Sequence, residues 1–133
     1  MARTALVVLA IIGLFVCTHI PNEFSEAALK KIGIEDDKTA HTIAYGCLTV
    51  IIALAFWRRL GALYAVLAAA LVVAVIGGLD EITQDFVGRV SSVRDWAADM
   101  LGAAYGAGGF LILATLGWIV NRSGSDRISR GVM

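Results

Sequence analysis

The chain is 133 residues long, and 59% of them are hydrophobic, which gives a mean hydropathy of +0.80. This apolar share exceeds the roughly 45–50% of ordinary soluble domains and so excludes that class of protein. The formal net charge is zero, so no overall positive field points to nucleic acid. The composition predicts a single all-α domain, residues 1–133, that is embedded in a membrane.

The first predicted membrane span, residues 4–20, is apolar and ends before Pro21. A helix of this length rises about 25 Å, near the short end of what crosses a bilayer. Its weakly basic start is similar to that of a signal peptide, but no small-residue cleavage site follows, so we expect an uncleaved span. His19, at the exit, is expected to be an interfacial histidine.

The polar segment 22–38 is expected to contain a short helix. Asn22 can cap that helix, and Phe24, Ala28 and Ile32 recur at i, i+4 and i+8. One apolar stripe on a polar helix predicts that the segment lies on the membrane surface rather than crossing it.

The second and third predicted spans, residues 39–57 and 60–79, are separated only by a tight turn and so form an antiparallel hairpin. At the start of the second span, Asp37, His41 and Tyr45 recur at i, i+4 and i+8. A carboxyl group, an imidazole and a phenol therefore share one helical face.

The stretch 77–106 concentrates acids in an otherwise apolar sequence and is the leading candidate site. Glu81 and Gln84 follow the third span on one helical face, and Ser92 with Asp95 resembles a capping box at the head of the next helix. A charge beside hydrocarbon costs roughly 2.5–3.5 kcal/mol on insertion scales, so such residues usually face a protein interior or a wet cavity.

The fourth predicted span, residues 96–120, begins beside Asp95, and Asp99 lies one turn further along the same face. Gly102 and Gly106 continue that face as a small-xxx-small stripe, which lets another helix approach closely.

Four spans place both termini on one side of the membrane. Arg3, Arg58, Arg59 and Arg122 directly flank the spans on that side, which predicts that both termini are cytoplasmic. The tail, residues 121–133, is rich in Ser, Gly and Arg and is expected to be disordered.

This topology gathers the polar residues of both outer connections at one face: Asp37, Lys38, His41, Tyr45, Glu81, Gln84, Arg89, Asp95 and Asp99. Three interpretations are open. In the first, these residues form an ion-pair and hydrogen-bond lattice that holds the helix ends together, because buried charges need partners.

In the second interpretation they form a pocket for a polar headgroup. Lys38 and Arg89 suit a phosphate or carboxylate, whereas His41, Glu81 and Asp95 suit proton transfer.

In the third interpretation the oxygen atoms of Glu81, Asp95 and Asp99 hold Mg²⁺ or Ca²⁺. No compact ligand motif such as His-Glu-x-x-His is present, so we expect neither a metal nor another cofactor.

The chain resembles the VanZ-like family in an ordered set of motifs: Asp37-Lys38-x-x-His41-x-x-x-Tyr45, Glu81-x-x-Gln84, Arg89 and Asp95-x-x-x-Asp99-x-x-Gly102-x-x-x-Gly106. The resemblance implies a small multi-pass protein of the bacterial inner membrane, in a family whose eponym is linked to low-level teicoplanin resistance. It also implies that these positions matter for function: Asp37, Lys38, His41, Tyr45, Glu81, Gln84, Arg89 and Asp95.

The chain departs from the family at Asp99, where relatives usually have asparagine. If this position only forms hydrogen bonds, as that asparagine favours, Asp99→Asn retains function. If the acid carries a proton or binds a metal, activity falls by roughly 10²-fold or more. We expect the first outcome, that Asp99→Asn retains function.

We therefore expect an outward-facing polar pocket that binds or modifies a cell-envelope component, with a membrane lipid or a lipid-linked envelope precursor as its partner. The expected catalytic residues are His41, Glu81 and Asp95. The expected substrate-binding residues are Asp37, Lys38, Tyr45, Gln84, Arg89 and Asp99. The alternatives are a non-enzymatic binding or assembly factor and, less favoured because the inner halves of the spans lack a polar path, a small transporter.

Overall fold

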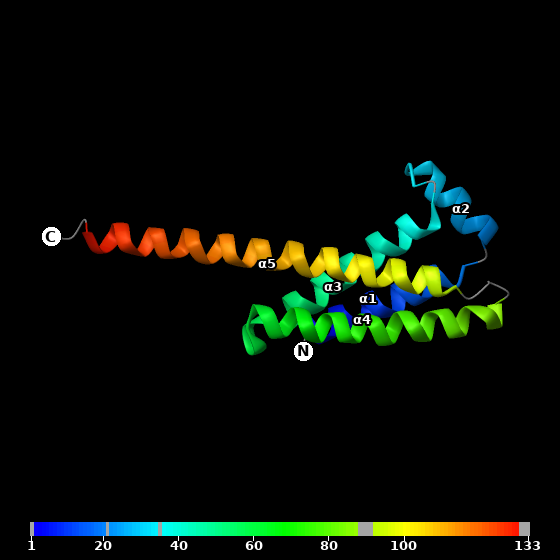
Figure 1. The fold of residues 1–133 in the computed structure, drawn as a ribbon, viewed down its shortest axis with the longest axis horizontal. Coiled ribbons are helices and arrows are strands. Elements are labelled where there is room, and N and C mark those ends of the chain that lie inside the picture. Colours follow the sequence, from blue (N-terminus) through cyan, green and yellow to red (C-terminus); the bar gives the residue numbers. More distant parts are fainter. Residues whose placement is uncertain (1, 21, 35, 88–91, 131–133) are drawn as a thin grey trace.

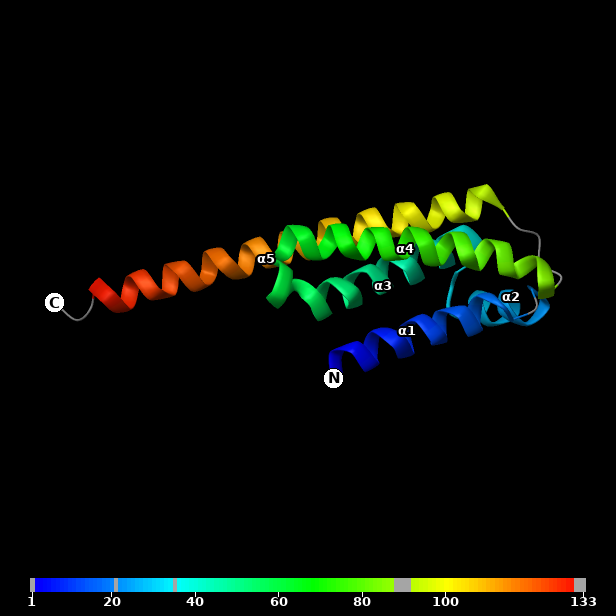
Figure 2. The same ribbon diagram turned by 90° about the horizontal axis from the view of Figure 1, so that it is seen from below.

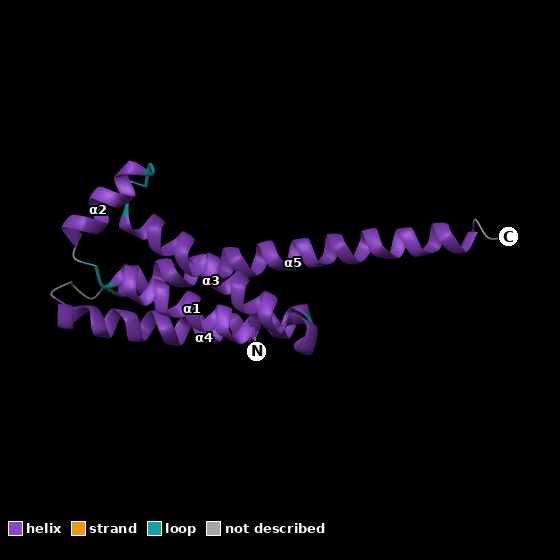
Figure 3. Cartoon of the chain, turned by 180° about the vertical axis from the view of Figure 1, so that it is seen from behind, coloured by secondary structure: helices purple, strands orange, loops and turns teal. Residues whose placement is uncertain are grey.

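The computed structural model describes residues 2–20, 22–34, 36–87 and 92–130, and within these ranges the chain contains helices and turns but no strand (Figure 3). The elements are α1 (Ala2–Thr18), α2 (Asn22–Lys31), α3 (Asp37–Leu60), α4 (Ala62–Gln84), the short 3-10 helix η1 (Asp85–Val87) and α5 (Val93–Arg130). The predicted all-α class is confirmed for this part of the chain.

Three helices have the length and composition of membrane spans: Asp37–Leu60, Ala62–Gln84 and Val93–Arg122. The apolar helix Arg3–Thr18 is shorter than these three. The four predicted spans therefore correspond to three long helices and one short helix, and the crossing by the short one stays a prediction.

The three long helices pack against one another, and α1 lies along α3 with a smaller contact to α4 (Figures 1 and 2). The N-terminal end of α1, the turn between α3 and α4, and the C-terminal end of α5 point to one end of the molecule. Helix α2, the end of α4 and the start of α5 lie at the opposite end, and the last part of α5 extends beyond the bundle.

The apolar core lies mainly between α3, α4 and α5 and contains small as well as large side chains. Its buried members are Val7, Tyr45, Leu48, Ile52, Ala53, Val66, Ala69, Val73, Ala103 and Phe110. Many other large apolar side chains face outward, such as Leu71 and Leu113, which are 67% and 70% exposed. Helices that are apolar inside and outside are typical of membrane spans.

Helices α3 and α5 cross at close range because glycines face each other there. A Cβ atom at Gly102 would collide with the carbonyl oxygen of Thr42, and one at Gly106 would collide with the carbonyl oxygen of Gly46. The predicted small-xxx-small contact is therefore confirmed, with α3 as the partner helix.

A single residue, Gly61, connects α3 to α4. Its φ of +79° favours glycine, and its N–H donates to the carbonyl oxygen of Trp57 at 2.8 Å, which ends α3. The predicted antiparallel hairpin is confirmed.

The helices extend beyond the predicted spans. Helix α3 begins at Asp37 because the Asp36 carboxylate accepts the N–H of Thr39 at 3.1 Å. Helix α5 continues to Arg130, where the sequence suggested a disordered tail from residue 121. Extending an existing helix costs much less than nucleating one, and no proline interrupts this segment.

Candidate functional site

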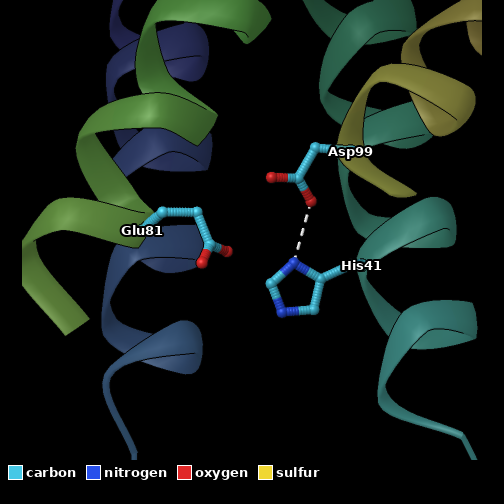
Figure 4. Close-up of side chains that lie close together, drawn as sticks. All are labelled: His41, Glu81 and Asp99. Carbon is cyan, nitrogen blue, oxygen red and sulfur yellow. Dashed lines mark hydrogen bonds and ion pairs between the residues drawn. The ribbon is translucent and has the colours of Figure 1, made fainter. Parts of the chain in front are cut away.

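Three of the predicted site residues meet where α3 and α5 begin and α4 ends: His41, Glu81 and Asp99 (Figure 4). One imidazole nitrogen and one oxygen from each carboxylate lie within 4.8 Å of one another. The three residues are 4%, 5% and 0% exposed. We call them the acid–histidine cluster.

The carboxylates of this cluster are only partly satisfied. His41 Nδ1 lies at hydrogen-bond distance, 2.8 Å, from Asp99 Oδ1. Glu81 Oε2 accepts a hydrogen bond from the backbone N–H of Ser92 at 2.7 Å. The second oxygens, Glu81 Oε1 and Asp99 Oδ2, are buried and have no hydrogen-bond partner in the part of the chain that the structure describes.

Ser92 connects α4 to the start of α5. Its hydroxyl oxygen accepts the N–H of Arg94 at 3.2 Å, which caps α5, while its own N–H goes to Glu81. The sequence suggested a capping box in which Asp95 accepts the N–H of Ser92. In the structure Glu81, from α4, accepts this N–H instead. This contact fixes the Glu81 side chain relative to α5.

A second buried group surrounds Asp80, which is 1% exposed. Its Oδ1 accepts from the Thr18 hydroxyl at 2.7 Å. Its Oδ2 accepts from the Tyr45 hydroxyl at 3.1 Å and from the Gln84 amide at 3.0 Å. We call Thr18, Tyr45, Asp80 and Gln84 the Asp80 network, in which both carboxylate oxygens have partners.

The sequence did not single out Asp80, the centre of this network, as a site residue. His19 Nδ1 lies 3.5 Å from Asp80 Oδ1, and His19 Nε2 lies 3.1 Å from the Thr83 hydroxyl, so this histidine contacts α4. Its place at the membrane interface stays a prediction. The i, i+4 spacing of Asp80 and Gln84 was a usable signal. The part played by Thr18 was not visible, because only the packing of α1 brings it to α4.

Three further predicted charged residues lie at the more exposed edge of the cluster: Asp37, Lys38 and Asp95. Lys38 Nζ is 3.3 Å from Asp95 Oδ1, and their side chains are 50% and 15% exposed. Asp37 Oδ2 is 4.0 Å from His41 Nε2. Arg89 lies outside the described residues.

An apolar cavity of about 290 Å³ lies beside the acid–histidine cluster, between α1, α2 and the first half of α3. Three residues of its lining carry polar groups of the site: Thr18, Asp37 and His41. The rest of the lining is almost entirely apolar: Leu14, Cys17, Ile20, Ala28, Leu29, Ile34, Ala40, Ile43 and Ala44. The cavity is thus apolar over most of its lining and polar where it meets Thr18, Asp37 and His41.

Apolar helices of spanning length that enclose a histidine and several carboxylates define a helical membrane protein with a buried polar site. Residues 5–114 match the VanZ/LLP1 family, and the chain belongs to this family. The matched range includes both the acid–histidine cluster and the Asp80 network. No curated protein and no solved structure matches the chain.

Proposed function

We propose that this chain binds or modifies a lipid or a lipid-linked precursor of the bacterial cell envelope. The observation that carries the proposal is the apolar cavity that reaches Asp37 and His41. The cavity therefore suits an amphipathic ligand. The hydrocarbon of such a ligand would lie against the apolar lining, and its headgroup would meet the polar residues.

The proposed setting is the bacterial inner membrane, with α1 as a fourth, short span and both termini in the cytoplasm. Arg58 and Arg59 close α3 at the end of the molecule to which the N-terminus of α1 also points, which agrees with the bias of basic residues toward the cytoplasm. Helix α2 would then lie on the outer membrane surface, beside the mouth of the pocket.

The residues divide into three proposed roles. Lys38, at the exposed edge, binds an anionic headgroup, and we assign Arg89 the same role from its place in the family motif. His41, Glu81 and Asp95 supply proton transfer if the ligand is modified. Asp37 and Asp99 orient His41 through the contacts described above.

Tyr45 and Gln84 have a more indirect role in this proposal. They are 0% and 1% exposed and both donate to Asp80. We therefore assign them a positioning role, in which they fix the end of α4 that carries Glu81.

A transporter is disfavoured by where the buried polar groups lie. Among the described residues, the only buried polar side chain away from the site end is Thr49, and its hydroxyl donates to the carbonyl oxygen of Tyr45 at 2.8 Å. A path for a polar solute through the other half of the bundle would need further polar groups. A binding or assembly factor without turnover needs no such path and is the second form of the proposal.

The proposal is tested by expressing the protein in a teicoplanin-susceptible bacterium. Wild-type protein should raise the inhibitory teicoplanin concentration, and His41→Ala and Asp95→Ala should abolish the effect at unchanged membrane levels. Lys31→Ala, an exposed charge on α2, should do little, since exposed charges contribute roughly 0–1 kcal/mol to stability. Loss of effect only in proportion to lost protein would favour the ion-pair lattice instead.

A second assay separates modification from binding. Purified protein is incubated with a lipid extract of the inner membrane, and the lipids are compared by mass spectrometry before and after. A product that His41→Ala does not form indicates an enzyme, whereas a retained but unaltered lipid indicates a binding factor.

A further inference from the structure

The acid–histidine cluster lacks positive charge. Glu81 and Asp99 are almost fully buried, and no lysine or arginine among the described residues lies within 4.0 Å of either carboxylate. His41, whose Nδ1 lies 2.8 Å from Asp99 Oδ1, is the only basic side chain there within 4.0 Å of either carboxylate. A buried carboxylate needs either a cation or hydrogen-bond donors for both of its oxygens. Because one oxygen of each carboxylate in the cluster has no donor among the described residues, the cluster calls for a cation.

Two lone oxygens show where that cation would bind. Glu81 Oε1 and Asp99 Oδ2 are buried without a hydrogen-bond partner, although both side chains are held in place through their other oxygen. Figure 4 shows the three side chains of the cluster pointing toward one another from three different helices. The Asp80 carboxylate, by contrast, has donors for both oxygens and offers no free ligand atom.

The ligand atoms are close enough to share one ion. One nitrogen and two oxygens lie within 4.8 Å of one another. Zinc holds nitrogen and oxygen ligands at about 2.0–2.2 Å, so a bound zinc ion would draw these three atoms closer together. Gly77 preserves this geometry, since a Cβ atom there would lie 2.8 Å from Asp99 Oδ2 and would displace the carboxylate.

We infer that His41, Glu81 and Asp99 form a binding site for a divalent transition-metal ion of the zinc type. The imidazole favours zinc over Mg²⁺ and Ca²⁺, which prefer oxygen ligands alone. Three protein ligands leave a fourth position for water or for an anionic oxygen of a ligand, as in catalytic zinc sites. This gives Asp99 the role of a metal ligand, which differs from the hydrogen-bonding role that the sequence led us to expect.

The test uses the full-length protein in detergent, stripped with a chelator and then titrated with Zn²⁺ alone. Wild-type protein should bind one zinc ion per chain. Glu81→Gln and Asp99→Asn should each weaken binding by at least about 10-fold, because even the loss of an outer-shell partner costs about 10–100-fold. The absence of one-to-one binding by wild type would overturn the site, as would unchanged affinity in both variants.

Two matched variants exclude a general effect of charge or fold. Asp85→Asn removes an exposed carboxylate that follows α4 and lies outside the cluster, and His19→Gln removes the other histidine of the chain. Both should leave the zinc affinity unchanged. X-ray absorption of zinc-loaded wild type does not depend on any variant folding, and it should show nitrogen and oxygen ligands with one imidazole. A sulfur ligand or two imidazoles would contradict the assignment.

The metal site and the proposed lipid ligand rest on different observations and can fail separately. Zinc ligation would replace the proton-transfer role proposed for His41 and Glu81, but it leaves the lipid cavity unchanged. Lipid retention by the metal-stripped wild type, measured by native mass spectrometry, reports on the lipid site without zinc. Retained lipid without zinc binding would leave the proposed function standing and remove the metal site, whereas zinc binding without any lipid would do the reverse.

Discussion

Asp80 shows how a carboxylate can be buried in this bundle without an arginine or lysine beside it. Thr18, Tyr45 and Gln84 donate hydrogen bonds to it from three different helices. Hydrogen bonds to a charged group contribute more than those between neutral groups, and an unsatisfied buried acceptor is costly. The Asp80 network is therefore expected to stabilise the contact of α1, α3 and α4.

The variant Tyr45→Phe tests the contribution of the Asp80 network to stability by removing a single hydroxyl group. It removes the hydroxyl that donates to Asp80 and keeps the aromatic ring in the core, so stability should fall by about 1–2 kcal/mol with the fold retained. Thermal unfolding in detergent measures the change. Tyr64→Phe is the matched control, because Tyr64 is 67% exposed on α4 and should change nothing. Equal stability of Tyr45→Phe and wild type would show that this bond contributes nothing.

The positions of site residues were predictable from the sequence where helical spacing alone determines which side chains share a face. Asp37, His41 and Tyr45 share a face of α3, and Glu81 and Asp99 occupy the facing ends of their helices, as the sequence indicated. The bond from Ser92 to Glu81 was not predictable, because it depends on how the start of α5 sits against α4.

At the scale of the elements, α3 and α5 can cross closely because Gly102 has no side chain between them. Gly102→Ala would drive a Cβ atom into the carbonyl oxygen of Thr42 and should destabilise the protein by roughly 1–3 kcal/mol, the usual cost of overpacking. Gly108→Ala is the matched change on the same helix, with no atom within 4 Å of the new Cβ. It should be neutral or stabilise by up to about 1 kcal/mol, because alanine favours helix.

The stabilities of Gly102→Ala and Gly108→Ala are measured by thermal unfolding in detergent, and their levels in the membrane are compared. Equal stability of Gly102→Ala and Gly108→Ala would mean that α3 and α5 do not approach closely at Gly102.

The helices themselves were predictable from apolar runs, but their ends were not. Helix α4 continues through Glu81 to Gln84 although its apolar run ends at Leu79, and α5 continues past the end of its apolar run at Val120. Hydropathy reports which residues suit a membrane, whereas a helix ends where caps or glycine stop it.

At the scale of the whole molecule, the proposed orientation makes a direct prediction. A reporter that is active only in the periplasm, fused after Met133, should be silent, because the arginines beside the spans favour a cytoplasmic C-terminus. The same reporter inserted after Gly33, in the connection between α2 and α3, should be active. The opposite pattern would turn the polar site toward the cytoplasm.

The cavity was beyond sequence analysis, because it forms where α1, α2 and α3 come together and no motif marks its apolar wall. Its position next to His41 is the observation that supports the proposed lipid ligand. We propose that the cavity and the acid–histidine cluster together bind one envelope lipid.

Photo-crosslinking in living cells tests that claim most directly. A photoreactive residue is placed at Ala44, which lines the cavity, or at Ala104, which is exposed on α5, and the attached lipids are identified by mass spectrometry. Crosslinks from position 44 should be enriched in one envelope lipid class, and His41→Ala should reduce that enrichment. Crosslinks from position 104 should match the bulk lipid composition of the membrane. The same bulk composition at both positions would contradict a specific lipid site in this protein.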